Sequence, residues 1–79
     1  MRLDKYLKLT RIVKRREVAK VLIEEGSIKA NNKVVKPSYE VKIGDIVNLK
    51  LGKREIIIKI KDIKEVVGKK NVDTLYEII

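Results

Sequence analysis

Apolar residues recur every three or four positions at the start of the chain, which is the repeat of an α-helix. Leu3, Tyr6 and Leu7 follow this spacing, so they share one helical face while the charged residues between them point outward. The pattern predicts a short helix over about residues 3–9, with Tyr6 in the core rather than stacked on a base. Asp4 falls in its first turn, where a carboxylate either satisfies exposed N–H groups or pairs with a nearby arginine.

A second helix is predicted over residues 15–25, where the same repeat is stronger. Its apolar stripe consists of Val18, Ala19, Leu22 and Ile23. Gly26 follows and readily adopts the positive φ at which helices end. Arg15 and Arg16 stand at the start of this helix, where cations at the positive end of the helix dipole cost a few tenths of a kcal/mol to ~1 kcal/mol. Their position therefore indicates anion binding rather than stabilisation.

After the second helix, apolar residues recur at about every second position, which is the repeat of a β-strand. Asn31 and Asn32 interrupt this pattern, and both tolerate positive φ, so they predict a tight hairpin turn. A second hairpin is predicted from residues 46–51 and 55–63, joined by residues 52–54.

The remaining segments complete the predicted fold. Gly44 and Asp45 read as a turn, and Asn71 as the cap of a short turn. Residues 75–79 are predicted to form a final strand that pairs with the sheet. The expected fold class is α+β, with two N-terminal helices followed by a small antiparallel sheet of about four to five strands. A chain of 79 residues has room for one domain.

Positive charge is concentrated in the first fifth of the chain. Twenty Lys and Arg face eleven Asp and Glu, which leaves a net charge of +9. Residues 1–16 contain seven of the basic residues and a single acid, so they carry six of those nine charges. A surface that is basic only for solubility would spread its charge more evenly. The concentration favours a polyanion as the partner, and nucleic acid above all.

The composition excludes several classes of site. The chain contains no Cys and no His, which excludes disulfides, Cys/His metal sites and thiol or imidazole catalysis. No spaced pair of carboxylates is recognisable, so we expect no enzyme, no metal and no cofactor. No apolar run approaches the ~20 residues that span a bilayer, and no signal peptide is recognisable, which predicts a cytoplasmic protein. Three Tyr with no Phe or Trp are too few for a base-stacking platform, so recognition of phosphate and shape is expected.

Several short motifs also occur in a recognisable order. They are Arg2-Leu3-Asp4-Lys5-Tyr6-Leu7, Lys14-Arg15-Arg16-Glu17-Val18-Ala19-Lys20, Gly26-Ser27-Ile28, Lys36-Pro37-Ser38 and Gly44-Asp45. In this order they resemble the S-four RNA-binding domain, or αL motif. The resemblance is closer still to the stand-alone family of the fifteen-kilodalton heat-shock protein and the RqcP ribosome-quality-control factors. It implies a single domain over residues 1–79, with an αL core over about 1–48 and a C-terminal hairpin extension over 49–79.

Two local features depart from the family pattern. Arg15 stands where many members carry the Ser or Thr that precedes the arginine opening the second helix, so a conventional N-cap is missing. Asn31-Asn32 replaces the commoner Asn-Gly turn.

The resemblance implies that the two helices and the first hairpin present a basic face to structured RNA. The implied RNA-binding residues are Arg2, Lys5, Lys8, Arg11, Arg15, Arg16, Lys20, Lys36 and Ser38. Arg2 and Arg16 match the family's RNA-contacting positions most directly. The implied function is to bind 23S rRNA and peptidyl-tRNA on obstructed large ribosomal subunits. There the protein would support C-terminal alanine tailing of the stalled chain together with the partner protein RqcH.

Other interpretations stay open from the sequence. The same face would serve a ribosome-assembly or hibernation protein that binds a different rRNA site. A module for acidic protein partners would also carry a basic segment, as would a protein that binds a membrane surface, although the first helix is too short to insert well. Nothing in the composition requires a dimer, so we expect a monomer.

Overall fold

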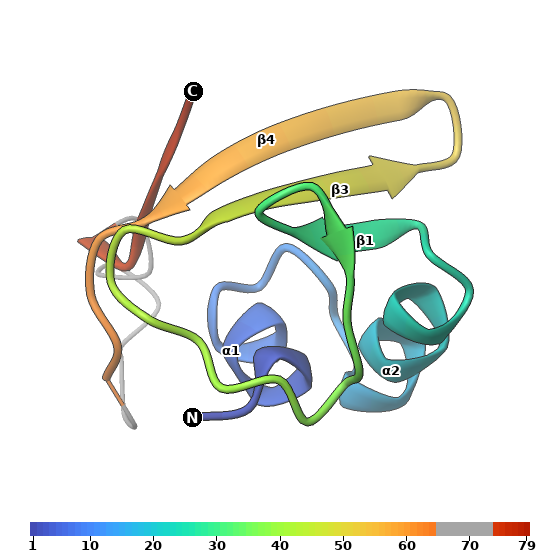
Figure 1. The fold of residues 1–79 in the computed structure, drawn as a ribbon, viewed down its shortest axis with the longest axis horizontal. Helices are drawn as coiled ribbons and strands as arrows, with labels where there is room; N and C mark the ends of the chain where they lie inside the picture. The colour runs from blue at the N-terminus through green and yellow to red at the C-terminus, as the bar shows by residue number, and fades with distance from the viewer. Residues whose placement is uncertain (65–73) are drawn as a thin grey trace.

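Two helices lie against one face of an antiparallel sheet in the computed structural model, which describes residues 1–64 and 74–79 (Figure 1). The helices are α1 (Leu3–Leu9) and α2 (Arg16–Glu24), and the strands are β1 (Ile28–Ala30), β2 (Lys33–Val34), β3 (Ile46–Leu51), β4 (Arg54–Ile60) and β5 (Tyr76–Ile78). Within the described part of the chain the strand order is β2-β1-β3-β4-β5. This arrangement confirms the predicted fold class and the final strand. The prediction for Asn71 lies outside the described residues.

The two ends of α2 behave as their residues predict. Arg15 occupies the N-cap position without a capping hydrogen bond from its side chain, so the missing cap is confirmed. At the other end Gly26 adopts φ +85°. Its N–H donates to the carbonyl of Ile23 at 3.1 Å, and the N–H of Ser27 donates to the carbonyl of Leu22 at 2.9 Å. These two bonds form a Schellman motif, which satisfies carbonyls that the last turn of a helix leaves without a partner.

Both predicted hairpins are present. Asn31 and Asn32 adopt φ values of 52° and 64°, as a two-residue type I′ turn requires, between the paired residues Ala30 and Lys33. In the second hairpin the turn is shorter than predicted, because Leu51 pairs with Arg54. Strand β4 also ends at Ile60, three residues before the predicted end.

The core lies between the helices and the inner face of the sheet. Leu3, Tyr6 and Leu7 on α1 have no exposed surface, which confirms that Tyr6 is a core residue. Its hydroxyl donates to the carbonyl of Leu75 at 2.8 Å, just before β5, and thereby ties α1 to the last strand. Burial raises the pKa of Tyr6 well above its ordinary value of 10.0.

The apolar stripe of α2 is only partly buried. Ala19 and Ile23 have no exposed surface, whereas Val18 is 46% exposed. Val18 therefore lies on the exposed side of the stripe. Val18 borders a surface groove together with Leu22 and Leu51. The side of the stripe that faces the core is therefore the one with Ala19 and Ile23.

Candidate nucleic-acid interface

A buried carboxylate joins the starts of the two helices. The side chain of Asp4 is 3% exposed and lies between two arginines. Its Oδ2 is 3.1 Å from Nη2 of Arg2, and its Oδ1 is 3.4 Å from Nη2 of Arg16. The N–H of Lys5 also donates to Oδ1 at 2.8 Å. The prediction that Asp4 pairs with a nearby arginine is confirmed, and a single carboxylate holds both arginines.

Both arginines remain largely open to solvent. The side chains of Arg2 and Arg16 are 46% and 42% exposed. A guanidinium carries five N–H donors in a planar fork, and Asp4 contacts one nitrogen of each. Each arginine is therefore held in place while it keeps donors for a second acceptor, such as a phosphate oxygen.

A loop from the sheet side closes against the start of α1. The N–H of Leu3 donates to the carbonyl of Tyr39 at 2.8 Å, and the N–H of Asp4 donates to the carbonyl of Pro37 at 3.3 Å. These bonds satisfy donors that the first turn of a helix leaves without an intrahelical partner. They also place Lys36 and Ser38 beside Arg2, although Arg2 is far from both in sequence.

The shape of this loop depends on a second buried carboxylate. Asp45 accepts hydrogen bonds from the hydroxyl of Tyr39 at 2.9 Å, the side-chain amide of Asn31 at 3.2 Å and the N–H of Lys42 at 2.9 Å. The bond to Asp45 raises the pKa of Tyr39. Asp45 thus ties the first hairpin turn to the loop that carries Lys36 and Ser38. The turn predicted at Gly44 and Asp45 is present, and the sequence pattern offered no sign of this network.

The result is a groove of about 570 Å³, which we call the Arg2 groove. Its lining residues are Arg2, Lys20, Glu24, Val34, Val35, Lys36, Pro37 and Ser38. A smaller hollow of about 280 Å³ adjoins it, because Arg2 and Lys20 line both. It adds Asp4, Arg16 and Glu17, and we count it as part of the Arg2 groove. Five of the nine predicted residues therefore meet here: Arg2, Arg16, Lys20, Lys36 and Ser38. Glu24 also lines the groove, which its place in the sequence did not predict.

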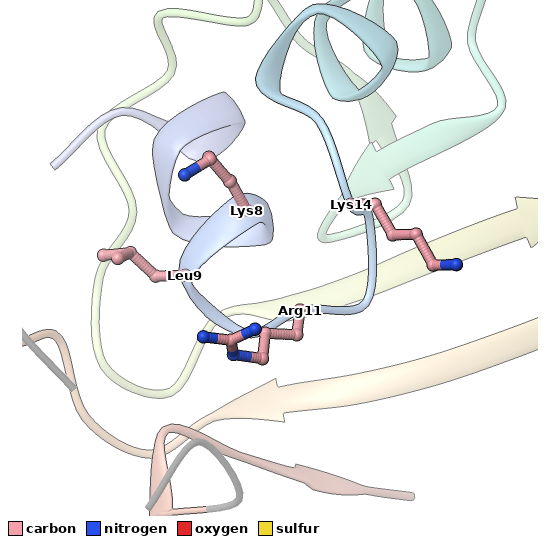
Figure 2. A pocket seen from close by; sticks show the side chains of 4 residues that line it. All are labelled: Lys8, Leu9, Arg11 and Lys14. Atoms are coloured by element: carbon pink, nitrogen blue, oxygen red, sulfur yellow. The ribbon is translucent and has the colours of Figure 1, made fainter. Parts of the chain in front are cut away.

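The other predicted residues lie elsewhere. Lys8 and Arg11 line a separate hollow of about 350 Å³ at the far end of α1, together with Leu9 and Lys14 (Figure 2). Arg15 borders the surface groove of Val18. Lys5 is half-buried on α1 and lines none of these hollows. The sequence did not single out Lys14, since it is one of several cations in a basic run.

The arrangement suits the binding of phosphate. Arginine forks bind phosphate oxygens in pairs, and lysines add positive charge without a fixed geometry. Among residues 1–64 and 74–79, no three His, Cys, Asp or Glu residues come together as metal ligands would. Over the same residues, no helix has the length and apolar character needed to cross a bilayer.

Residues 1–47, which include the Arg2 groove, match the S4 domain. The chain belongs to the S4 domain family. This match confirms the family resemblance that the order of the motifs indicates. S4 domains bind RNA.

Relatives of full length agree with this assignment. A protein of Streptococcus pneumoniae named "RQC P-site tRNA stabilizing factor" is 42% identical over 79 residues, which cover 100% of this chain and 90% of the relative. A protein of Bacillus subtilis with the same name is 34% identical, and the match covers 100% of this chain and 92% of that relative. Among solved structures, heat shock protein 15 of Vibrio cholerae, described as trimeric, superimposes with a TM-score of 0.94. It is 34% identical, and the superposition covers 100% of this chain and 81% of that chain.

Proposed function

We propose that this protein is a ribosome-associated quality-control factor that holds a P-site tRNA on an obstructed large ribosomal subunit. The observation that carries the proposal is the Arg2 groove, where Arg2 and Arg16 are oriented by one buried carboxylate and flanked by Lys20 and Lys36. The proposal is supported by relatives that match all 79 residues of this chain and are named RQC P-site tRNA stabilizing factor.

The groove recognises RNA through its backbone. Arg2 and Arg16 donate paired hydrogen bonds to phosphate oxygens, and Lys20 and Lys36 set the register of the strand by charge. Ser38 contributes a hydroxyl at the rim of the groove, where it can bond phosphate or a 2′-hydroxyl. Because none of the described residues that line the groove is aromatic, base stacking does not contribute to affinity there.

The finer parts of the proposal concern partners and place. We propose that the same face contacts 23S rRNA and peptidyl-tRNA, and that the protein acts with RqcH during C-terminal alanine tailing. It works in the cytoplasm as a monomer and as one domain over residues 1–79, with its RNA-binding core over about 1–48. Sedimentation of the purified protein tests the monomer, since the solved relative is described as trimeric.

The experiment that tests the function is crosslinking in cells during induced stalling, followed by sequencing of the attached RNA. Arg16→Ala is the variant, and Arg54→Ala is the matched control, because Arg54 is an exposed arginine of β4 outside the groove. We expect joint 23S rRNA and tRNA peaks that Arg16→Ala abolishes and Arg54→Ala keeps. In vitro, Arg16→Ala should weaken RNA binding by roughly 1–3 kcal/mol.

Four outcomes would contradict the proposal. Crosslinks spread evenly over all RNA, or equal losses in the two variants, would mean that the groove has no specific role. An Arg16→Ala protein that fails to fold would show that Arg16 serves the structure instead. Peaks on rRNA during ordinary growth, with no change during stalling, would favour a ribosome-assembly protein that uses the same face.

A further inference from the structure

Buried residues and hydrogen bonds fix the backbone of the loop between α1 and α2. Thr10 is 2% exposed, and its hydroxyl donates to the carbonyl of Leu7 at 2.7 Å and accepts from the N–H of Ile12 at 3.4 Å. Val13 is 5% exposed and anchors the next turn of the loop in the core. The N–H of Arg11 donates to the carbonyl of Lys8 at 3.0 Å. The side chains that this loop carries outward therefore start from fixed positions.

Arg11 occupies a backbone conformation that arginine rarely adopts. Its φ is 63°, in the left-handed region that favours Gly and Asn. A residue with a Cβ in this region costs stability, and such strain persists where the surrounding structure imposes it, often at functional sites. Asn would reduce the cost without the charge. The presence of Arg11 here is unfavourable for folding, so it calls for another reason.

Charge at this site points the same way. Lys8, Leu9, Arg11 and Lys14 line one hollow of about 350 Å³, which we call the Arg11 hollow. Figure 2 shows Lys8 projecting from α1, Arg11 from the loop and Lys14 from the limb of the loop that leads to α2. Among the described residues, no carboxylate forms an ion pair with any of these three cations. In Figure 2 the Lys14 side chain extends away from those of Lys8 and Arg11, so the cations border the hollow from different sides. Like charges repel one another, so cations placed around one hollow do not stabilise the fold.

We infer that the Arg11 hollow is a second phosphate-binding site, which holds an RNA backbone segment separate from the one in the Arg2 groove. Within the described part of the chain the two sites share no lining residue, and they lie toward opposite ends of α1. Arg11 donates a paired hydrogen bond to a phosphate, while Lys8 and Lys14 neutralise its neighbours. This inference rests on the proposed function, because it assigns a second contact to the same RNA-bound protein. It adds Lys14 to the RNA-binding residues.

The test measures the affinity of the intact protein for purified tRNA and for purified large ribosomal subunits over a series of salt concentrations. Arg11→Asn removes the charge and introduces a residue type that tolerates positive φ. Lys8→Gln/Lys14→Gln removes the charges of the two lysines. Each lost phosphate contact should weaken binding to at least one of the two RNAs on the order of threefold to tenfold and should lower the salt slope by about one. The melting temperature of Arg11→Asn should stay the same or rise.

The matched controls are Arg54→Asn and Lys53→Gln/Lys59→Gln, which remove the same charges from exposed positions of the second hairpin. If these controls weaken binding as much as the loop variants do, overall charge explains the effect and the inference fails. If Arg11→Asn disturbs folding, the lysine pair decides the outcome in its place.

Combining the loop variants with Arg16→Ala separates this inference from the proposed function. Losses that add between the two sites support two independent RNA contacts. If Arg16→Ala weakens binding and the loop variants do not, the second site is wrong and the proposed function stands. If the loop variants weaken binding and Arg16→Ala does not, the Arg2 groove is wrong as the main contact.

Discussion

The two ends of α1 both carry positive charge, but they orient it by different means. At the first end, Asp4 is buried and holds Arg2 and Arg16 at 3.1 and 3.4 Å. At the other end, Lys8 and Arg11 have no such carboxylate among the described residues. The last turn of α1 carries Lys8, and the hydrogen-bonded loop backbone positions Arg11. Cations can therefore be oriented by a buried opposite charge or by a rigid backbone. A buried opposite charge lowers the local positive charge, whereas a rigid backbone leaves that charge unchanged.

Removal of the buried charge should have the largest effect. Asp4→Asn keeps the shape of the side chain but ends its attraction to both arginines, so unfolding should require about 1–3 kcal/mol less free energy. Urea denaturation measures this change. The substitution also makes the protein more positive, so a groove that works by charge alone would bind RNA more tightly. We expect weaker binding, because the two arginines lose their orientation. Tighter binding would break the comparison at this end.

Tyr6, in the middle of α1, supplies a reference substitution that should lower stability without a selective effect on RNA binding at either end of the helix. Tyr6→Phe removes the hydrogen bond to the carbonyl of Leu75 and should lower the free energy of unfolding by about 1–2 kcal/mol. Because burial raises the pKa of Tyr6 in the folded state, the unfolded chain loses its proton first as pH rises above 10.0. The stability linked to Tyr6 is therefore complete below that pH and falls above it.

Denaturation at a series of pH values checks the alkaline part of this prediction. Tyr6→Phe should lose stability less steeply than the original chain above pH 10.0, where part of the loss comes from Tyr6. Parallel curves for the two proteins would mean that Tyr6 ionises as readily in the folded state as in the unfolded one. At neutral pH, Tyr6→Phe should have only a small effect on RNA affinity, and the effect should be the same at the Arg2 groove and at the Arg11 hollow.

Disruption of the loop backbone should have a smaller effect on stability and a selective one on binding. Thr10→Val keeps the shape of the side chain but removes the bonds to Leu7 and Ile12, which should cost about 1 kcal/mol. Thr10→Ser keeps the hydroxyl and serves as the control. We expect Thr10→Val to weaken the RNA contact of the Arg11 hollow and to leave that of Arg16 intact. Equal losses at both sites would show that the two ends are not independent.

An exposed carboxylate beside α1 should matter least. The amino group of Met1 lies 2.9 Å from Oε2 of Glu40, whose side chain is 73% exposed. Ion pairs of this kind contribute little, because water screens them, so Glu40→Gln should change stability by less than about 0.5 kcal/mol. Thermal denaturation beside Asp4→Asn measures the contrast. A loss as large as that of Asp4→Asn would mean that burial is not what makes Asp4 important.

Several parts of the fold and the site could be predicted from local pattern. The repeat of Leu3, Tyr6 and Leu7 predicted α1, and Gly26 predicted the end of α2, because both depend on neighbours along the chain. The turn at Asn31 and Asn32 follows from their tolerance of positive φ. The count of cations indicated an RNA-binding segment, since charge adds up whatever the fold.

Other parts could not be predicted in the same way. The exposure of Val18 depends on how α2 lies on its neighbours, and the helical repeat of one element carries no such information. The strained φ of Arg11 follows from the hydrogen bonds of Thr10 and the anchoring of Val13, not from any preference of arginine.

What the sequence by itself determined was the kind of each element, the order of the elements and the region that carries the charge. Only the tertiary structure decided how that charge is divided. Hydrogen bonds between α1 and a distant loop bring Lys36 and Ser38 to Arg2. Lys14 lines a separate hollow with Lys8 and Arg11. The reason is physical, because a sequence repeat reports the faces of one element. Contacts between elements depend on backbone bonds and burial across the whole chain.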